Sequence, residues 1–279
     1  MSALNADLHC HSTVSDGMLS PTELVRRAVA NGVELLALTD HDELGGLAEA
    51  RAEADAWGLR FIDGVEVSVS YLDQTVHIVG LGIQPDSEAL RNGLAAVKSG
   101  RGSRAQRMSD ELAKIGIRGV YEGAAKYAEN PELIGRAHFA RYLVEIGIAR
   151  DTSEVFDNYL VRGKPGFVDH EWATLAEALG WIHAAGGLAV IAHPGRYRFS
   201  RAEMTRLFDE FRDLDGEGVE VVTSAHTPQM TNEYATMARR YGLLASRASD
   251  FHAPGEGSMD LGKIPPLAPD LTPVWTRLI

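Results

Sequence analysis

The stretch ADLHCHSTVSDG, residues 6–17, holds two histidines and two acids within ten positions. Residues 4–11 are typical of a short strand that runs into a turn, and alternate side chains along a strand point to opposite faces. We therefore expect one face to carry Asp7, His9 and His11, and the other to carry Leu8 and Cys10. Such a cluster suits a metal ion. Two histidines on one face of a strand are hydrogen-bonded parts of the structure about as often as they are metal ligands. The rest of the sequence is therefore needed to choose between these two interpretations.

The composition is that of a globular protein. The chain has 279 residues, 45% hydrophobic and 7% aromatic, and α/β barrels of this length are commonly one domain. We find no apolar run long enough to cross a bilayer and no signal peptide at Met1, so we expect a cytoplasmic protein without a membrane partner. The single cysteine, Cys10, excludes an internal disulfide, and we expect it in the core rather than among metal ligands.

The charge of the chain limits its partners. A formal net charge of −12 argues against a broad, non-specific grip on nucleic acid, which needs a basic face, so we expect no duplex partner. One run of cations could help to bind an anionic substrate, but we favour the interpretation that it is a solvated helix face. The run consists of Lys98, Arg101, Arg104, Arg107, Lys114 and Arg118.

Helix and strand patterns alternate over most of the chain. Ser20 as N-cap, Pro21 at the first helical position, Glu23 closing a capping box and Gly32 as stop predict the first helix. Apolar runs and helical patterns then follow one another, which indicates an α/β fold. The predicted strands lie within residues 33–38, 60–69 (read as a strand pair), 188–195, 218–226 and 242–252, and the predicted further helices within 43–57, 175–185, 202–212 and 232–241.

One interval breaks this rhythm. Residues 92–169 contain an amphipathic segment and further short helical patterns, and we interpret them as a helical insertion that could cap a substrate site. The barrel itself is then built from residues 1–91 and 170–279. The Pro-rich segment 263–275 is expected to be irregular.

Polar residues recur where the predicted strands end. In parallel β/α architectures these ends converge on one mouth, so the side chains are expected to meet. Imidazoles mixed with carboxylates suit Mn²⁺, Fe²⁺ or Zn²⁺ better than Ca²⁺ or Mg²⁺. The residues are His9, His11, Asp16, Asp40, His41, Asp42, Glu66, His77, His193, His226, Asp250 and His252.

The ordered motifs DLHCHSTVSDG, LTDHD, GVEVS, VHIVGL, IAHPGR and SDFH resemble those of the polymerase and histidinol phosphatase (PHP) family. The resemblance implies an α/β fold, a distorted (β/α)₇ barrel of the TIM-like PHP type, which holds two or three metal ions and hydrolyses phosphoesters. It implies one ion on His9, His11, Glu66 and Asp250, a second on Glu66, His77 and His193, and a third on Asp16, His41 and His252. Asp16 stands where many members have histidine, which puts the third site in question. Manganese is the metal we expect first, with iron or zinc as alternatives.

Further motifs, IGRAHFARYLVEIG, KPGFVDHEW, AHPGRY and SAHTPQM, resemble the stand-alone bacterial 3′,5′-nucleoside bisphosphate phosphatases, whose relatives also act as 5′-to-3′ exoribonucleases on short RNA. We therefore expect either a phosphatase for a small nucleotide bisphosphate or an exoribonuclease for short 5′-phosphorylated RNA. A histidinol phosphate phosphatase is disfavoured, because two separate places that bind an anion fit a substrate with two phosphates. The intact ligand set argues against a non-catalytic metal-binding regulatory module.

The expected chemistry is attack by a metal-bridging hydroxide, for which no nucleophilic side chain is needed. His193, His226 and Asp40 are the unranked candidates for an acid. A substrate phosphate needs donors, and Arg suits it because its planar fork binds two oxygens at once. The candidate phosphate-binding residues are Arg136, His138, Lys164, Arg196 and His226. Asp7 and Asp40 are expected to hold ligating imidazoles, Asp42 could instead cap a helix, and the sequence leaves the oligomeric state open.

Overall fold

A computed structural model describes residues 4–279 as a seven-stranded barrel in which the strands follow one another in chain order. Only β4 runs against its neighbours, since it pairs antiparallel with both β3 and β5, and the other sheet pairs are parallel. The barrel closes where Leu8 N donates to Arg247 O at 3.1 Å and where Cys10 bridges Phe251. The strands are β1 (Ala6–Asp7), β2 (Leu35–Leu38), β3 (Arg60–Tyr71), β4 (Gln74–Leu81), β5 (Leu188–Ile191), β6 (Gly218–Thr223) and β7 (Leu244–Ala248). The expected distorted α/β barrel is thus confirmed.

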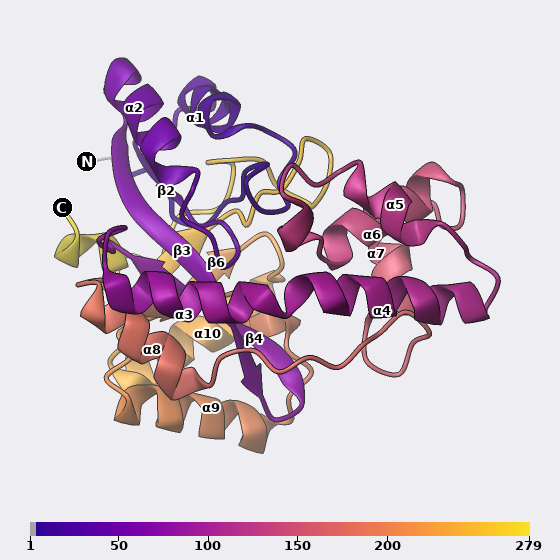
Figure 1. The fold of residues 1–279 in the computed structure, drawn as a ribbon. Coiled ribbons are helices and arrows are strands. Elements are labelled where there is room, and N and C mark those ends of the chain that lie inside the picture. The colour runs from indigo at the N-terminus through magenta and orange to yellow at the C-terminus, as the bar shows by residue number, and fades with distance from the viewer. Residues whose placement is uncertain (1–3) are drawn as a thin grey trace.

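Helices cover the outside of the barrel (Figure 1). They are α1 (Pro21–Ala30), α2 (Leu47–Trp57), α3 (Glu88–Ser99), α8 (Leu175–Ala184), α9 (Arg201–Asp213) and α10 (Pro228–Tyr241). The capping box of Ser20 and Glu23 begins α1 as expected. One apolar cluster fills the barrel interior and a larger one lies between strands and helices. None of the helices among the described residues is both long and apolar enough to span a membrane.

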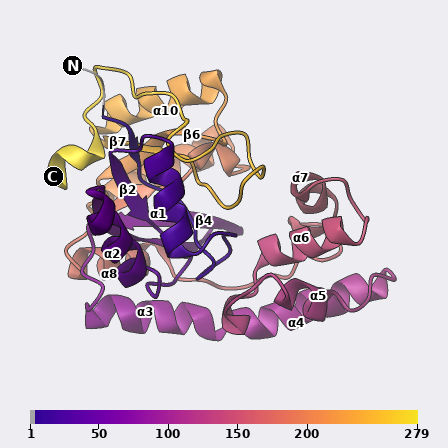
Figure 2. The same ribbon diagram turned by 90° about the horizontal axis from the view of Figure 1, so that it is seen from above.

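A group of helices extends to one side of the barrel (Figure 2). It comprises α4 (Arg101–Lys114), α5 (Val120–Ala125), α6 (Arg136–Glu145), α7 (Thr152–Val155) and the short turns Pro131–Leu133 and Phe156–Leu160. These elements share their own apolar cluster, which includes Met108, Leu112 and Phe139. By contrast, Leu94 of α3 packs in the barrel's outer cluster. We therefore propose that the insertion, called the cap below, begins after α3, at the α3–α4 junction, rather than at residue 92.

The α3–α4 junction depends on Gly100. A Cβ atom built on Gly100 would lie 2.2 Å from Cε1 of His170, so a larger residue at this position would push the imidazole aside. His170 in turn packs against Trp172 at a ring-centroid distance of 4.2 Å. The chain that returns from the cap thereby lies against the helix that leads into it.

Several predicted boundaries are wrong. Residues 60–69 form part of one long strand rather than a pair, and α10 begins four residues before position 232. The second helix begins at Leu47 instead of 43, because Asp42 has a left-handed backbone (φ 51°) and the Glu43 carboxylate accepts from Leu44 N. The first strand ends at Asp7, so the strict alternation over residues 4–11 fails.

Candidate metal centre

The loops after the strands deliver most of the predicted ligands to one end of the barrel. His9 and His11 follow β1, His41 follows β2, and two further ligands adopt left-handed backbone after β5 and β7, namely His193 (φ 27°) and Asp250 (φ 53°). Such conformations are costly for residues other than glycine and concentrate at functional sites. Glu66 and His77 differ from the expectation, because they lie within β3 and β4 rather than at strand ends.

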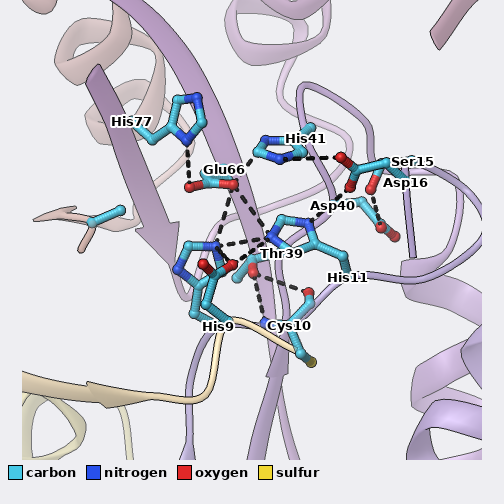
Figure 3. Close-up of polar contacts among 12 residues, drawn as sticks. His9, Cys10, His11, Ser15, Asp16, Thr39, Asp40, His41, Glu66 and His77 are labelled. Carbon is cyan, nitrogen blue, oxygen red and sulfur yellow. Dashed lines mark hydrogen bonds and ion pairs between the residues drawn. The ribbon is translucent and has the colours of Figure 1, made fainter. Parts of the chain in front are cut away.

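Glu66 lies at the centre of the site (Figure 3). Its Oε1 is 2.8 Å from His77 Nδ1 and 3.0 Å from His193 Nε2. Its Oε2 is 2.7 Å from His41 Nδ1, 3.2 Å from His9 Nε2 and 3.3 Å from His11 Nε2. The two oxygens of one carboxylate therefore face two different groups of imidazoles.

Two more carboxylates complete the cluster. Asp250 Oδ1 lies 3.2 Å from His11 Nε2 and 3.5 Å from His9 Nε2. Asp16 Oδ1 lies 3.4 Å from His252 Nε2, and its Oδ2 lies 3.7 Å from His41 Nε2. The structure thus brings together all nine predicted ligand residues.

Within the described residues, four groups have ligand atoms close enough to hold an ion. They are His9, His11 and Asp250; His9, Glu66 and His193; His41, Glu66 and His77; and His11, Asp16, His41 and His252. The last of these groups contains all three residues that the family resemblance implies for the third ion, together with His11. These groups are chemically able to hold metal ions.

The polar atoms of this cluster fit metal ions because many of them have no well-aligned hydrogen bond among the described residues, although several lie within ion-pair distance of another charged group. Such atoms are His11 Nδ1, Asp16 Oδ1, His41 Nδ1, Glu66 Oε2, His77 Nδ1, His193 Nδ1 and both Asp250 oxygens. Nε2 of His9 also faces Nε2 of His11 at 3.0 Å. Buried polar atoms without partners are costly, and divalent cations would satisfy this donor set.

The electrostatics of the cluster favour ionised carboxylates. Burial alone would raise the pKa of Glu66, but the surrounding histidines hold it well below its usual value. Burial likewise opposes ionisation of Asp250, yet Arg196 and His9 keep its pKa well below the usual range. Burial lowers the pKa of His41, but the carboxylates of Glu66 and Asp16 outweigh this effect and raise the pKa to about 9. The site therefore attracts positive charge.

Sequence reasoning missed Glu220, which supports the cluster from β6. Its Oε1 lies 2.7 Å from His9 Nδ1, and its Oε2 accepts from His193 N at 2.6 Å. Such a carboxylate fixes the orientation of a ligating imidazole. The only sequence signal was an acid inside the apolar run GVEVV, where a buried charge needs a partner. Tyr197 supports the backbone at another ligand, since its hydroxyl accepts from His77 N at 2.9 Å.

The two acids expected to hold imidazoles do other work. Asp7 accepts from Ser249 N and Gly262 N, both at 2.8 Å, so it fastens the segments after β7. Asp40 accepts from Ser12 N at 2.8 Å and also from the Ser12 and Ser15 hydroxyls, and it shapes the turn that carries the neighbouring ligands. The expectation that either orients an imidazole is wrong.

Two candidates for phosphate binding, His226 and Arg196, contact the turn after β5 and Asp250, respectively. Gly195 N donates to His226 Nε2 and His226 Nδ1 donates to Val221 O, both at 3.0 Å, so neither ring nitrogen is free for a phosphate or a proton transfer. A Cβ on Gly195 would lie 2.7 Å from His226 Cδ2, so this contact requires glycine. Arg196 Nη2 lies 2.7 Å from Asp250 Oδ2, with its side chain 47% exposed.

The cap contributes the remaining candidates. Arg136 stands at the first turn of α6, and no described side chain forms a hydrogen bond or an ion pair with it. His138 is fully buried, accepts from Gly135 N through Nδ1 at 3.0 Å, and has no partner for Nε2 within the described protein. Lys164 is exposed on the loop that leaves the cap.

The interpretation of the cationic run as a solvated face is wrong for two of its members, and a third, Lys98, is only partly exposed and lies 2.8 Å from Glu43. Arg101 and Arg104 are buried, because both guanidinium groups lie over the Trp172 ring, at 4.7 and 5.4 Å from its centroid. Arg101 also pairs with Asp42, which therefore does not cap a helix. Arg107, Lys114 and Arg118 are exposed as expected.

Cys10 is buried, and its Sγ donates to Ala37 O at 3.1 Å. It packs in the outer cluster, whereas Leu8 lies in the barrel interior, so the two do not share a face. The expectation of a core thiol is confirmed.

Comparison with known proteins agrees with this geometry. The family model described as PHP domain matches residues 7–224. A 3′,5′-nucleoside bisphosphate phosphatase of Chromobacterium violaceum is 51% identical over 98% of this chain and 96% of its own, and a 5′-3′ exoribonuclease of Haemophilus influenzae is 42% identical over 97% and 98%. A solved amidohydrolase structure from Chromobacterium violaceum, with bound sulfate and no metal, superposes with a TM-score of 0.96 at 51% identity, over 98% of this chain and 95% of that one. The chain belongs to the PHP domain family.

Proposed function

We propose that the protein is a metal-dependent phosphatase that removes the 3′-phosphate from nucleoside 3′,5′-bisphosphates, such as adenosine 3′,5′-bisphosphate. The observation that carries the proposal is a buried cluster of imidazoles and carboxylates next to a cap that offers two phosphate donors. They are Arg136, which no described side chain pairs with, and the buried ring of His138. Such a site can bind cations on one side and a phosphate on the other. The 51% identical relative named for this activity supports the assignment.

Two or three divalent ions per chain would be held by the nine ligand residues, with Mn²⁺ as the first candidate and Fe²⁺ or Zn²⁺ as alternatives. When bound, they would supply an activated water and positive charge for the phosphoryl oxygens. Glu66 is suited to serve two ions because its two oxygens face separate imidazole groups.

The protein's own groups would bind and orient the phosphate that is cleaved. Arg196 is fixed by Asp250 and still half exposed, so its remaining N–H groups can donate to phosphoryl oxygens. Of the three candidate acids, Asp40 already accepts three hydrogen bonds and His226 has both ring nitrogens engaged. His193 is one of the nine ligand residues, and a neutral imidazole that binds an ion is a poor proton donor, so we assign none of the three as the acid.

The second phosphate would bind at the cap. Because Gly135 N donates to His138 Nδ1, the proton of the neutral ring is on Nε2, where it is a donor without an acceptor among the described residues. Burial lowers the pKa of His138 to about 4, so the ring is neutral near pH 7. Arg136 on the same helical turn adds a charge, and the exposed Lys164 adds a weaker one.

A second candidate function is 5′-to-3′ exoribonuclease activity on short 5′-phosphorylated RNA. The 42% identical relative named for this activity favours it, and the same cap groups would hold the 5′-phosphate of the chain. Both candidates take small, single-stranded substrates, and neither requires duplex nucleic acid. The cytoplasm remains the proposed location.

Initial rates of phosphate or nucleotide release would separate the candidates. The substrates are adenosine 3′,5′-bisphosphate, AMP, histidinol phosphate and a 5′-phosphorylated trinucleotide, each with added Mn²⁺. We expect the bisphosphate to be hydrolysed fastest. Preference for the trinucleotide would select the nuclease, preference for histidinol phosphate would contradict both proposals, and no hydrolysis of any substrate would support a non-catalytic module.

A further inference from the structure

Arg141 of α6 joins the cap to the barrel. Its Nε and Nη2 each lie 2.8 Å from one oxygen of Glu256, and its Nη1 donates to the backbone oxygen of Asp16 at 2.6 Å. The Arg141 side chain is 5% exposed and that of Glu256 is 29% exposed, so solvent screens this pair less than a pair on the open surface. A two-pronged, charge-assisted contact of this kind fixes both position and angle.

Arg101 of α4 forms a second bridge. Its Nη2 donates to Asp42 Oδ2 and, at 3.1 Å, to Ser68 Oγ. Asp42 in turn accepts from Ser68 N at 2.8 Å, and its own N–H donates to Glu66 O at 2.9 Å. This contact therefore connects the cap to the loop after β2 and to the middle of β3.

Both bridges end on the segments that carry one particular group of candidate ligands. Asp16 is contacted directly through its backbone, and His41 immediately precedes Asp42. His252 lies four residues before Glu256, and its oxygen accepts from Met18 N at 2.8 Å, which ties it to the Asp16 turn.

The remaining ligands are supported from within the barrel. Glu220 of β6 contacts His9 and His193, and the Tyr197 hydroxyl accepts from the backbone of His77. The two parts of the centre thus have different supports. His9, His77 and His193 are supported by the barrel, whereas the Arg101 bridge also reaches the backbone of Glu66 through Asp42. The segments that carry Asp16, His41 and His252 depend on contacts with the cap.

We propose that Arg101 and Arg141 are positioning residues through which the cap holds Asp16, His41 and His252 in place for the third ion. This inference rests on the proposed metal centre. It adds that the affinity of one ion, and not of the others, depends on how the cap is seated. Removing such supporting contacts typically weakens metal affinity by about 10- to 100-fold.

The arrangement also couples the ion to the substrate anion. Arg136, His138 and Arg141 all stand on α6, so the proposed phosphate donors and the bridge to Asp16 move as one helix. Because coupling between two sites is reciprocal, an ion that steadies the Asp16 turn would also steady the phosphate donors. Occupancy of the third site would then be linked to binding of the non-reacting phosphate.

Mn²⁺ titrations of the full-length, chelator-stripped protein, with free Mn²⁺ measured by electron paramagnetic resonance, test the proposal. In Arg141→Met we expect one of the three ions to lose roughly 10- to 100-fold in affinity while the other two keep theirs. Arg101→Met should affect the same ion. Glu256→Gln retains the shape of the partner and should weaken that ion in the same direction, which keeps the test informative if an arginine variant fails to fold.

The matched control is Arg239→Met, which removes an exposed arginine paired with both oxygens of Asp270, at 2.7 and 3.1 Å, on the barrel exterior. It should leave all three affinities unchanged. Wild-type affinities in Arg141→Met and Glu256→Gln would overturn the inference, and so would a parallel loss of all ions, which indicates general damage to the fold. A wild-type protein that binds two ions would refute the third site alone, whereas one that binds none would refute the metal centre itself.

Discussion

The barrel mouth and the cap are both rich in buried charge, but of opposite sign. At the mouth, Glu66 and Asp250 remain ionised although they are fully or almost fully buried, because histidines and Arg196 lower their pKa values. In the cap, burial together with repulsion from Arg136 and Arg101 lowers the pKa of Arg104 to about 9. One region is poised for cations and the other for anions.

This difference suggests how substrate selectivity arises. In the proposed function, a phosphomonoester would satisfy only the barrel half, because its one phosphate would bind with the ions. A bisphosphate would also supply negative charge for Arg104 and Arg136, which have no carboxylate partner among the described residues. Binding energy gained at the second phosphate can then orient the first for reaction.

The largest effect is expected from Glu66→Gln. An amide cannot neutralise two cations, so the barrel mouth should no longer bind its ions. We expect a loss of several kcal/mol in transition-state stabilisation, which is at least about a thousandfold in kcat. Metal content, measured beside the wild type, should fall with activity. Full metal content together with retained turnover would remove Glu66 from the proposed bridging position.

A second prediction concerns pH and belongs to the cap. Burial lowers the pKa of His138 from 6.5 to about 4 in the folded protein, so below pH 6.5 the unfolded chain takes up a proton that the folded chain refuses. The stability that His138 contributes is therefore present above pH 6.5 and is lost as the pH falls towards 4. The loss approaches about 3 kcal/mol.

Urea unfolding of the metal-free protein between pH 7 and pH 4 measures this loss. The variant His138→Gln keeps an acceptor for Gly135 N but does not titrate, so its stability should fall less steeply over the same interval. Parallel curves for the two proteins would show that His138 is not held neutral by the cap.

The barrel half could be predicted from the sequence because its chemistry is unusual. Histidine and acid pairs such as those around His9 and His41 recur at the ends of apolar runs, and parallel strands bring such ends together. Glu220 was missed because it is a single acid within a predicted strand. No sequence pattern distinguishes an acid that supports imidazoles from an acid at the solvent-exposed edge of a sheet. The precise length of β1 was missed because alternation describes a regular strand and the chain leaves the ladder after Asp7.

The cap could be predicted only in outline. Apolar spacing indicated helices, but Arg101 and Arg104 have the spacing of a solvated face, and only the approach of Trp172 from another segment buries them. Likewise, nothing local to Arg141 announces that Glu256, 115 residues away, accepts its hydrogen bonds. Long-range partners of charged residues are the information that periodicity does not contain.

A third prediction tests whether the cap reads the second phosphate. Charge-assisted bonds to phosphate typically contribute about 1.5–3 kcal/mol, so Arg136→Ala should lose roughly 10- to 100-fold in kcat/KM on adenosine 3′,5′-bisphosphate. Hydrolysis of a simple aryl phosphate, which has no second anion, should change little. Equal losses on both substrates would mean that Arg136 contacts the reacting phosphate or supports the scaffold. No loss on either substrate would mean that Arg136 is a surface residue without a role in substrate binding.

The smallest effect is expected at Lys164, which tests how far the cationic half extends. Lys164 is exposed, and an exposed charge contributes less than about 1 kcal/mol and is screened by salt. Lys164→Ala should therefore lower kcat/KM on the bisphosphate by roughly two- to fivefold at low ionic strength, and the difference should vanish near 0.5 M salt, at a Debye length of about 4 Å. The control Lys114→Ala removes an exposed lysine whose Nζ lies 2.6 Å from Glu111 Oε1, and it should have no effect. A loss at Lys164 that persists in high salt would mean direct contact with the substrate, because only a desolvated pair escapes screening, and the anion-binding half would then reach beyond α6 to the loop that leaves the cap.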